Sequence, residues 1–259
     1  MEKSLVKEDV DLLTIFKNEK IDFSDLSFNI EDCDNLEFNY EISPKVFLRF
    51  AKIDFESGDL RGYVNAITNS KRAIDCQTDK ILSTFNIDVE DIPKSAIEFI
   101  QQNSEAKKTD SRAALKLIQA LDIAPIGLIS KVRMLRHKLE HFYKTPTVEE
   151  TKEAIDLAEF FINATQHKVY INYSFYIGNH FNGEDMFNHI DFRYDQKNGC
   201  FTLTTADEEK KSIYTNSVVF YYLLMLTICA EDINDVQDTF KKLLKFINHP
   251  IPLNNVKVT

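Results

Sequence analysis

The sequence predicts a mainly α-helical fold, and three observations support this prediction. Among 259 residues there are only 6 Gly and 6 Pro, which is few for the turn-dense chain of an all-β sandwich. The hydrophobic content of 44%, with 20 Phe and 10 Tyr, is enough for a sizeable core. Long stretches have apolar residues at helical spacing, whereas residues rich in aromatic and β-branched types gather after position 166. We therefore expect an antiparallel helical bundle followed by a smaller C-terminal α+β appendage.

Charge and periodicity divide the chain into three expected segments. Residues 1–41 carry twelve Asp and Glu against four Lys, a charge of −8 out of the total of −10. We therefore expect an acidic N-terminal segment over 1–41, a helical bundle over 42–166 and an α+β segment of unknown role over 167–259. The acidic segment could compete with a nucleic acid for a basic surface elsewhere in the chain.

The helical block is expected to begin at Ser43-Pro44, an N-cap residue followed by proline at the first helical position. Gly58-Asp59 predicts the end of that helix and the cap of the next. Residues 60–85 then form a long amphipathic helix, whose apolar residues lie near multiples of the helical turn: Tyr63, Ile67, Ile74, Ile81 and Leu82. Shorter helices are expected from Pro93 and over 111–123.

Beyond residue 166 the pattern changes to that of strands. Two or three antiparallel strands are expected over 168–177, 189–194 and 200–205, with Lys197-Asn198-Gly199 as a turn before the last. Two further helices are expected near 215–230 and 233–248.

The cysteines and the apolar runs indicate the compartment. The four cysteines are scattered, with no CxxC pair or close Cys/His spacing: Cys33, Cys76, Cys200 and Cys229. The N-terminus has no signal-peptide pattern, and the run from Val218 to Cys229 is shorter than the roughly 20 residues that span a bilayer. We expect a soluble, cytoplasmic protein with reduced cysteines and no membrane partner.

A helix starting near Ile126 carries the candidate site. Its apolar residues repeat at intervals of four and three and form one stripe: Leu128, Val132, Leu135, Leu139 and Phe142. His137 and His141 face away from this stripe, Arg133 and Lys144 share their outward side, and Arg136 lies on its flank. Residues 131–144 hold five Lys or Arg against the single Glu140, a local charge of +4. An imidazole exchanges protons near neutral pH and a guanidinium binds phosphate oxygens, so this set suits phosphodiester cleavage.

The run from Arg136 to His141 resembles the signature of HEPN-domain ribonucleases, in which an arginine and a polar residue are followed by three residues and a histidine. The context is also similar, because residues 143–146 form a short loop and Thr147-x-x-Glu150 is a capping box that starts another amphipathic helix to about residue 165. The long helix over 60–85 resembles the family's first long helix. The resemblance covers about residues 45–165.

The resemblance implies a helical bundle that forms a homodimer with a composite active site and cuts RNA without a metal or cofactor. His141 would be the general base on the ribose 2′-hydroxyl, Arg136 would stabilise charge on the phosphoryl oxygens, and His137 would orient the phosphate or the catalytic histidine. Arg133 and Lys144 would bind RNA phosphates. Family members act as toxins or antiphage effectors, often held in check by an antitoxin or another regulatory partner.

Two other functions fit the same residues. His137-x-x-Glu140-His141 matches the H-x-x-E-H pattern of zinc metallopeptidases, in which case Glu208 or Glu209 would have to supply a third ligand. Alternatively, the bundle binds RNA or nucleotide, or dimerises, without cutting.

Overall fold

The computed structural model describes residues 10–35, 40–103, 112–124, 126–166, 170–180 and 186–259. The chain divides into two compact units, each taking roughly half of its length. We call residues 35–93 and 97–170 the helical unit. Residues 1–34, 94–96 and 171–259 make up the sheet unit. The described residues of the acidic segment up to residue 34 therefore belong with the C-terminal half of the chain.

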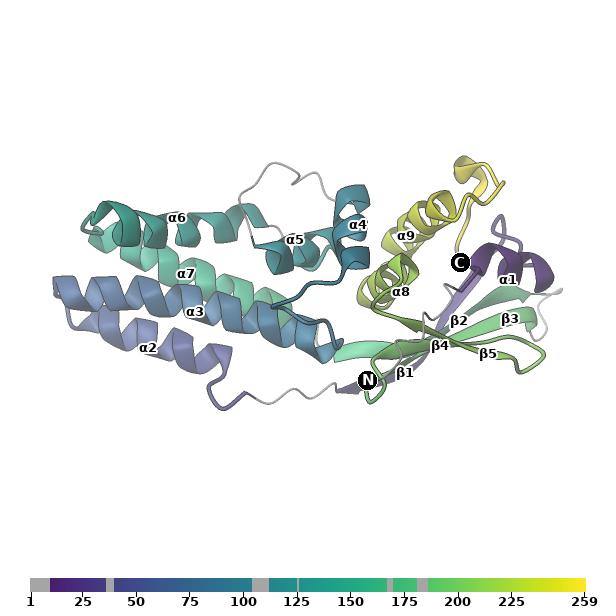
Figure 1. Cartoon of the computed structure of the whole chain (residues 1–259), viewed down its shortest axis with the longest axis horizontal. Coiled ribbons are helices and arrows are strands. Elements are labelled where there is room, and N and C mark those ends of the chain that lie inside the picture. Colours follow the sequence, from purple (N-terminus) through teal and green to yellow (C-terminus); the bar gives the residue numbers. More distant parts are fainter. Residues whose placement is uncertain (1–9, 36–39, 104–111, 125, 167–169, 181–185) are drawn as a thin grey trace, which may run out of the picture. The chain divides into compact units, whose positions relative to one another are not determined.

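The helical unit contains five α-helices and most of a sixth among the described residues. These are α2 (Pro44–Glu56), α3 (Leu60–Thr84), α5 (Ala113–Ala120), α6 (Ile126–Phe142) and α7 (Val148–Thr165), with α4 (Lys94–Asn103) crossing the boundary between the units. Figure 1 shows α2, α3, α6 and α7 running side by side. Helix α3 packs against the other three and against α5, so it is the central helix of this unit.

The expected boundaries of α2 and α3 are confirmed, whereas α5 covers Ala113–Ala120 where a helix over 111–123 was expected. Ser43 precedes α2 as its N-cap and Pro44 is its first residue. The Asp59 side chain caps α3 by accepting a hydrogen bond from the Gly62 amide at 2.7 Å. At the far end of α3, the buried Gln77 side chain donates to the hydroxyl of Thr165 on α7 at 3.1 Å, so the two helices are joined inside the core.

The sheet unit is built on a five-stranded sheet in the order β1-β2-β3-β4-β5. The strands are β1 (Ser27–Asn35), β2 (Tyr170–His180), β3 (Met186–Asp195), β4 (Cys200–Thr204) and β5 (Lys210–Tyr214). Each of the pairs β2–β3, β3–β4 and β4–β5 is antiparallel, with Phe175 opposite Phe192 and Phe192 opposite Leu203. Helices α1 (Leu12–Asn18), α8 (Val218–Ile228) and α9 (Ile233–Phe246) complete the unit, and Figure 1 shows them on one side of the sheet.

Alternation along the strands explains why one face of the sheet carries the helices. Buried apolar side chains recur at every second strand position, among them Phe175, Ile177, Ile190, Phe192, Phe201, Leu203 and Ile213. The Phe201 ring lies 5.3 Å from that of Phe220 on α8. Every residue of α8 is buried, which confirms that this apolar run is a core helix. No helix in the described part of the chain combines the length and the apolar character needed to cross a membrane.

The predicted fold class is wrong: the protein is mixed α+β rather than a mainly helical bundle with a small appendage. The sheet has five strands where two or three were expected, because two strands carry only a short strand-like sequence pattern. In β1 (SFNIEDCDN) the apolar and polar alternation stops at Ile30, before an acidic run, and β5 (KKSIY) is short with two lysines. Both depend on their neighbours in the sheet for their full length.

The C-terminal residues are fixed to the N-terminal part of the sheet unit. Leu26 and Val258 form a parallel bridge. The Lys257 amide donates to the Phe23 carbonyl at 2.9 Å, and the Thr259 amide donates to the Leu26 carbonyl at 2.8 Å. The two ends of the described chain thus share one hydrogen-bonded segment.

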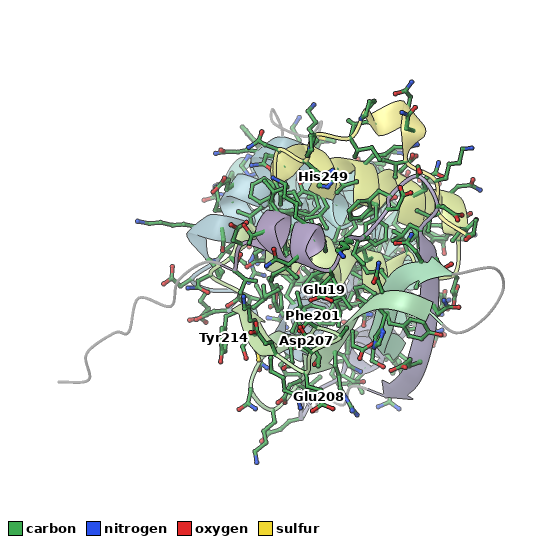
Figure 2. The ribbon with its side chains drawn as sticks, turned by 90° about the vertical axis from the view of Figure 1, so that its right-hand side faces the viewer. Glu19, Phe201, Asp207, Glu208, Tyr214 and His249 are labelled. Carbon is green, nitrogen blue, oxygen red and sulfur yellow. The ribbon has the colours of Figure 1, made fainter. Side chains whose placement is uncertain are left out.

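His249 is expected to make the stability of the sheet unit depend on pH. Its ring lies edge-on to Phe23 at 5.1 Å, and its Nδ1 accepts a hydrogen bond from the Ile251 amide at 3.3 Å. Figure 2 shows His249 on the side of the sheet unit that carries its helices, far from Glu208 in the turn between β4 and β5. Burial, with a smaller contribution from Lys17, lowers the pKa of His249 below its ordinary value of 6.5.

Because the folded pKa is the lower one, the contribution of His249 to stability should be fully present above pH 6.5 and lost as the pH falls through the folded value. We expect denaturant unfolding of the wild-type sheet unit to shift to lower denaturant between pH 7.5 and pH 5.5. The His249→Gln variant should show a smaller shift over the same interval. Equal shifts in both proteins would contradict the assignment.

Candidate functional site

Helix α6 carries all three predicted catalytic residues and packs against α3, α5 and α7. Val132 and Leu135 are buried and fix one side of the helix in the core. His137 and His141 are both exposed, on the side that the helical spacing predicted. The candidate site therefore lies on the solvent side of α6. The side chain of Leu128, the first residue of the predicted apolar stripe, lies outside the described residues.

The two imidazoles form a close pair. Their ring centroids are 4.4 Å apart and their planes are inclined by 45°. The ring of Phe142 contacts His137 nearly edge-on, with centroids 5.7 Å apart. The four-residue spacing of His137 and His141 brings their two rings together, because residues so spaced lie on the same face of a helix one turn apart. A group bound at this surface would thus meet both imidazoles together.

Arg136 lies beside this pair and is engaged by a carboxylate of its own helix. Its Nη2 atom is 2.5 Å from Oε1 of Glu140, one turn further on, and the two side chains are 30% and 44% exposed. An exposed pair of this kind contributes only about 0.3–0.5 kcal/mol, so an anion can displace the glutamate at small cost. The guanidinium also has five N–H donors, and one ion pair leaves others to bind a phosphate.

The basic surface of α6 is weaker than its sequence indicated. Lys131 pairs with Glu153 at 2.7 Å and Lys138 approaches Glu150 at 3.8 Å, both on α7. These two carboxylates of α7 reduce the local charge of the region from +4, which already includes Glu140, to +2. The sequence alone did not show this, because the neutralising residues come from the next helix.

Arg133 and Lys144 are the two cations of this region without an ion pair to another described residue. The Nη1 atom of Arg133 is buried and has no hydrogen-bond partner there. This atom is shielded from solvent, so a phosphate could reach the Arg133 guanidinium only through its other nitrogens. Neither of these two predicted phosphate-binding residues is paired with a described carboxylate of α7.

Helix α6 ends in an exposed aromatic pair. Phe142 was expected in the buried stripe, and this was wrong, because its side chain is 61% exposed. The last turn of α6 and the first turn of α7 are both open to solvent, since Val148 is also 44% exposed. The next residue, Tyr143, has a φ of +51° and is 88% exposed. Neither feature of Tyr143 has a sequence signal.

The loop between α6 and α7 is held by the predicted capping box, which the structure confirms. The Thr147 hydroxyl accepts a hydrogen bond from the Glu150 amide at 3.1 Å, and the Glu150 carboxylate accepts one from the Thr147 amide at 3.1 Å. Pro146 is buried. The end of α6 therefore has a fixed position relative to the start of α7.

The ligand set required for a zinc peptidase is not assembled in the part of the chain that the structure describes. No group of three or more His, Cys, Asp or Glu lies close enough there to hold a metal ion. Glu208 and Glu209 belong to the turn between β4 and β5 in the sheet unit. Glu140, the residue that would activate water, is paired with Arg136.

Among the described cysteines, Cys76 is a poor candidate for an alternative nucleophile. Cys200 is buried, Cys76 and Cys229 are partly buried, and the side chain of Cys33 lies outside the described residues. Burial, with a smaller contribution from the Asp79 carboxylate, raises the pKa of the Cys76 thiol to about 11. A thiol with such a pKa is almost entirely protonated at neutral pH and is a poor nucleophile.

No protein-family model, curated protein or solved structure matches this chain. The interpretation of the site therefore depends on its own geometry and on the resemblance of residues 136–141 to the HEPN signature.

Proposed function

We propose that this protein is a metal-independent endoribonuclease of HEPN type. The observation that carries the proposal is the exposed pair of imidazoles, whose ring centroids are 4.4 Å apart, one turn from each other on α6, with Arg136 directly before His137 on the same helix. Two proton-exchanging groups and an oxyanion-binding group are what cleavage by the ribose 2′-hydroxyl requires. The proposed reaction needs no metal ion.

In this proposal His141 takes the proton of the 2′-hydroxyl, whose oxygen then forms a bond to the phosphorus. The bond from phosphorus to the 5′ oxygen breaks, and that oxygen takes up a proton, for which the protonated imidazole of His137 is the adjacent donor. Arg136 stabilises the negative charge on the phosphoryl oxygens. The products are a 2′,3′-cyclic phosphate and a free 5′-hydroxyl.

The proposed working form is a homodimer in the cytoplasm, in which the two copies of α6 face each other across a shared site. The exposed positions of His137 and His141 support this arrangement, because a second copy can reach them. Met134, which is 56% exposed, supplies apolar surface on the same helix. Arg133 and Lys144 bind the phosphates of the RNA, and an antitoxin or other regulatory partner would cover this surface.

A second candidate function is RNA binding or dimerisation without cleavage. The observation in its favour is the ion pair between Arg136 and Glu140, which occupies part of the guanidinium that catalysis would need. In that case the protein would bind RNA through Arg133 and Lys144 and leave it intact.

The test is incubation of end-labelled total RNA and transfer RNA with the full chain in EDTA, followed by analysis of the product ends. We expect cutting in the presence of EDTA and 2′,3′-cyclic phosphate ends, which T4 polynucleotide kinase removes. Bound but uncut RNA would favour the second candidate. Activity that requires added zinc would contradict both.

A further inference from the structure

Several helices of this protein end in a residue with left-handed backbone conformation that is not glycine. Helices α1, α3, α5 and α9 are followed by Lys20, Asn86, Asp122 and Asn248, whose φ angles lie between 53° and 58°. In each case the next amide donates back to a carbonyl in the last turn, as from Ile87 to Leu82 at 3.1 Å. This is the usual way in which a helix is closed by a left-handed residue.

Tyr143 follows α6 with a similar φ of +51°, and the next amide, that of Lys144, donates to the Lys138 carbonyl at 3.3 Å, six residues back where the other four helices have five. Asn and Asp tolerate this conformation because their short polar side chains bond locally, whereas a bulky aromatic residue there is strained. Glycine would close the helix without that strain.

Packing of the Tyr143 side chain does not compensate for this backbone strain. It is 88% exposed, the highest value among the large apolar and aromatic side chains that are exposed in the described part of the chain. A residue that the fold disfavours on its backbone and does not bury through its side chain is a candidate for function.

The surroundings of Tyr143 indicate what its ring would meet. It follows His141 by two residues, and its neighbour Phe142 is 61% exposed with its ring against His137. On its other side is Lys144, a cation that no described carboxylate pairs. An aromatic ring between a phosphate-binding cation and a proton-exchanging imidazole matches how proteins hold single-stranded RNA, with bases stacked on rings and phosphates on cations.

We propose that Tyr143 is a stacking platform for an unpaired base next to the scissile phosphate, so that the protein selects single-stranded RNA. This inference rests on the proposed function, whose site it extends. A base inside a duplex is already stacked on both faces and cannot lie on the ring of Tyr143. With 88% of its surface exposed, the Tyr143 side chain is accessible to a nucleotide.

The test compares the affinity of the full chain for single-stranded and duplex RNA, measured by fluorescence anisotropy with 2′-O-methyl RNA that the proposed chemistry cannot cut. Removing one stacking ring should weaken binding of the single strand by roughly tenfold to a hundredfold. We expect this loss in Tyr143→Gly and in Tyr143→Leu, whereas Tyr143→Phe should bind as the wild type does.

The unfolding temperature separates this role from a structural one. Because glycine relieves the backbone strain, Tyr143→Gly should unfold at the same or a higher temperature than the wild type while binding RNA more weakly. Asp122→Gly is the matched control, since it makes the same backbone change at the end of α5. It should leave the affinity for RNA unchanged.

A fluorescent variant reports stacking directly, because the chain contains no tryptophan. The fluorescence of Tyr143→Trp should be quenched in a saturable manner by single-stranded RNA. Phe160→Trp, at a position on α7 that is 57% exposed, should not be quenched. Suppose that the wild type binds or cuts RNA. If Tyr143→Gly then binds single-stranded RNA and duplex RNA as tightly as the wild type does, only the stacking inference fails. If the wild type neither binds nor cuts RNA, the proposed function fails with it.

Discussion

His141→Ala should reduce RNA cleavage by about 100-fold to 10,000-fold, because a positioned general base contributes that much to proton transfer. The imidazole is exposed and on the last turn of α6, so its removal leaves the buried residues of the helix in place. The measurement is the initial rate of cutting of end-labelled RNA in EDTA. Unfolding by heat should be unchanged within about 0.5 kcal/mol, as expected for a surface substitution.

Arg136→Ala should lower the same rate by about 100-fold, since it removes the group that stabilises the phosphoryl charge. Arg136→Lys should restore little of the rate, because an ammonium group cannot reproduce the two-pronged contact of a guanidinium with a phosphate. Cutting that persists in both His141→Ala and Arg136→Ala would place the active site elsewhere.

Glu140→Gln is the control that separates the ribonuclease from the zinc peptidase. In the ribonuclease, glutamine releases Arg136 from its ion pair and the rate should be equal to or above that of the wild type. In the peptidase, the same carboxylate would activate water, and glutamine would abolish activity. The two mechanisms therefore predict opposite signs for one substitution.

Gly62→Ala should destabilise the helical unit by about 2 kcal/mol, which is within the usual range for overpacking. A Cβ atom at Gly62 would lie 1.8 Å from the Ser57 hydroxyl and 2.2 Å from the Asp54 carbonyl oxygen at the end of α2. The hydroxyl can rotate away, but the carbonyl is backbone and can move only with the helix. Helix propensity favours alanine by up to about 1 kcal/mol, so a loss of stability would identify the close approach of α2 as its cause.

Gly58→Ala is the matched control for this effect. Its Cβ would meet nothing within 4 Å, but its φ of +69° is unfavourable for alanine. We expect a loss of about 1 kcal/mol from backbone strain alone. Denaturant unfolding followed by helical circular dichroism measures both variants, and a smaller loss for Gly62→Ala than for Gly58→Ala would contradict the packing explanation.

The sequence predicted those elements whose signals are local. The cap and proline at Ser43-Pro44, the Gly58-Asp59 boundary and the Thr147 capping box all appear in the structure. The Asp59 and Thr147 caps are hydrogen bonds within four residues, and Pro44 suits the first helical position although the Ser43 side chain makes no capping bond.

What depended on distant neighbours was missed. Strand β1 alternates apolar and polar residues only over 26–31, and its full length depends on β2 beside it in the sheet. The neutralisation of Lys131 and Lys138 comes from α7, and the exposure of Phe142 follows from where the two helices end. Within the candidate site, the outward direction of the histidines followed from helical spacing. The ion pair of Arg136 with Glu140 is one that the four-residue interval between them permits.

The pairing of chain ends in the sheet unit constrains the order in which this protein can fold during its synthesis. Strand β1 leaves the ribosome early, but its neighbour β2 follows only after the whole helical unit, and the partner of Leu26 is at residue 258. The helical unit is made without interruption apart from residues 94–96, and its contacts are mostly between helices close in sequence, which form fast. The helical unit can therefore fold before β1 can pair with β2. A nascent chain arrested far enough beyond residue 170 for α7 to leave the ribosomal tunnel should present α6 and its imidazoles before the sheet unit has folded.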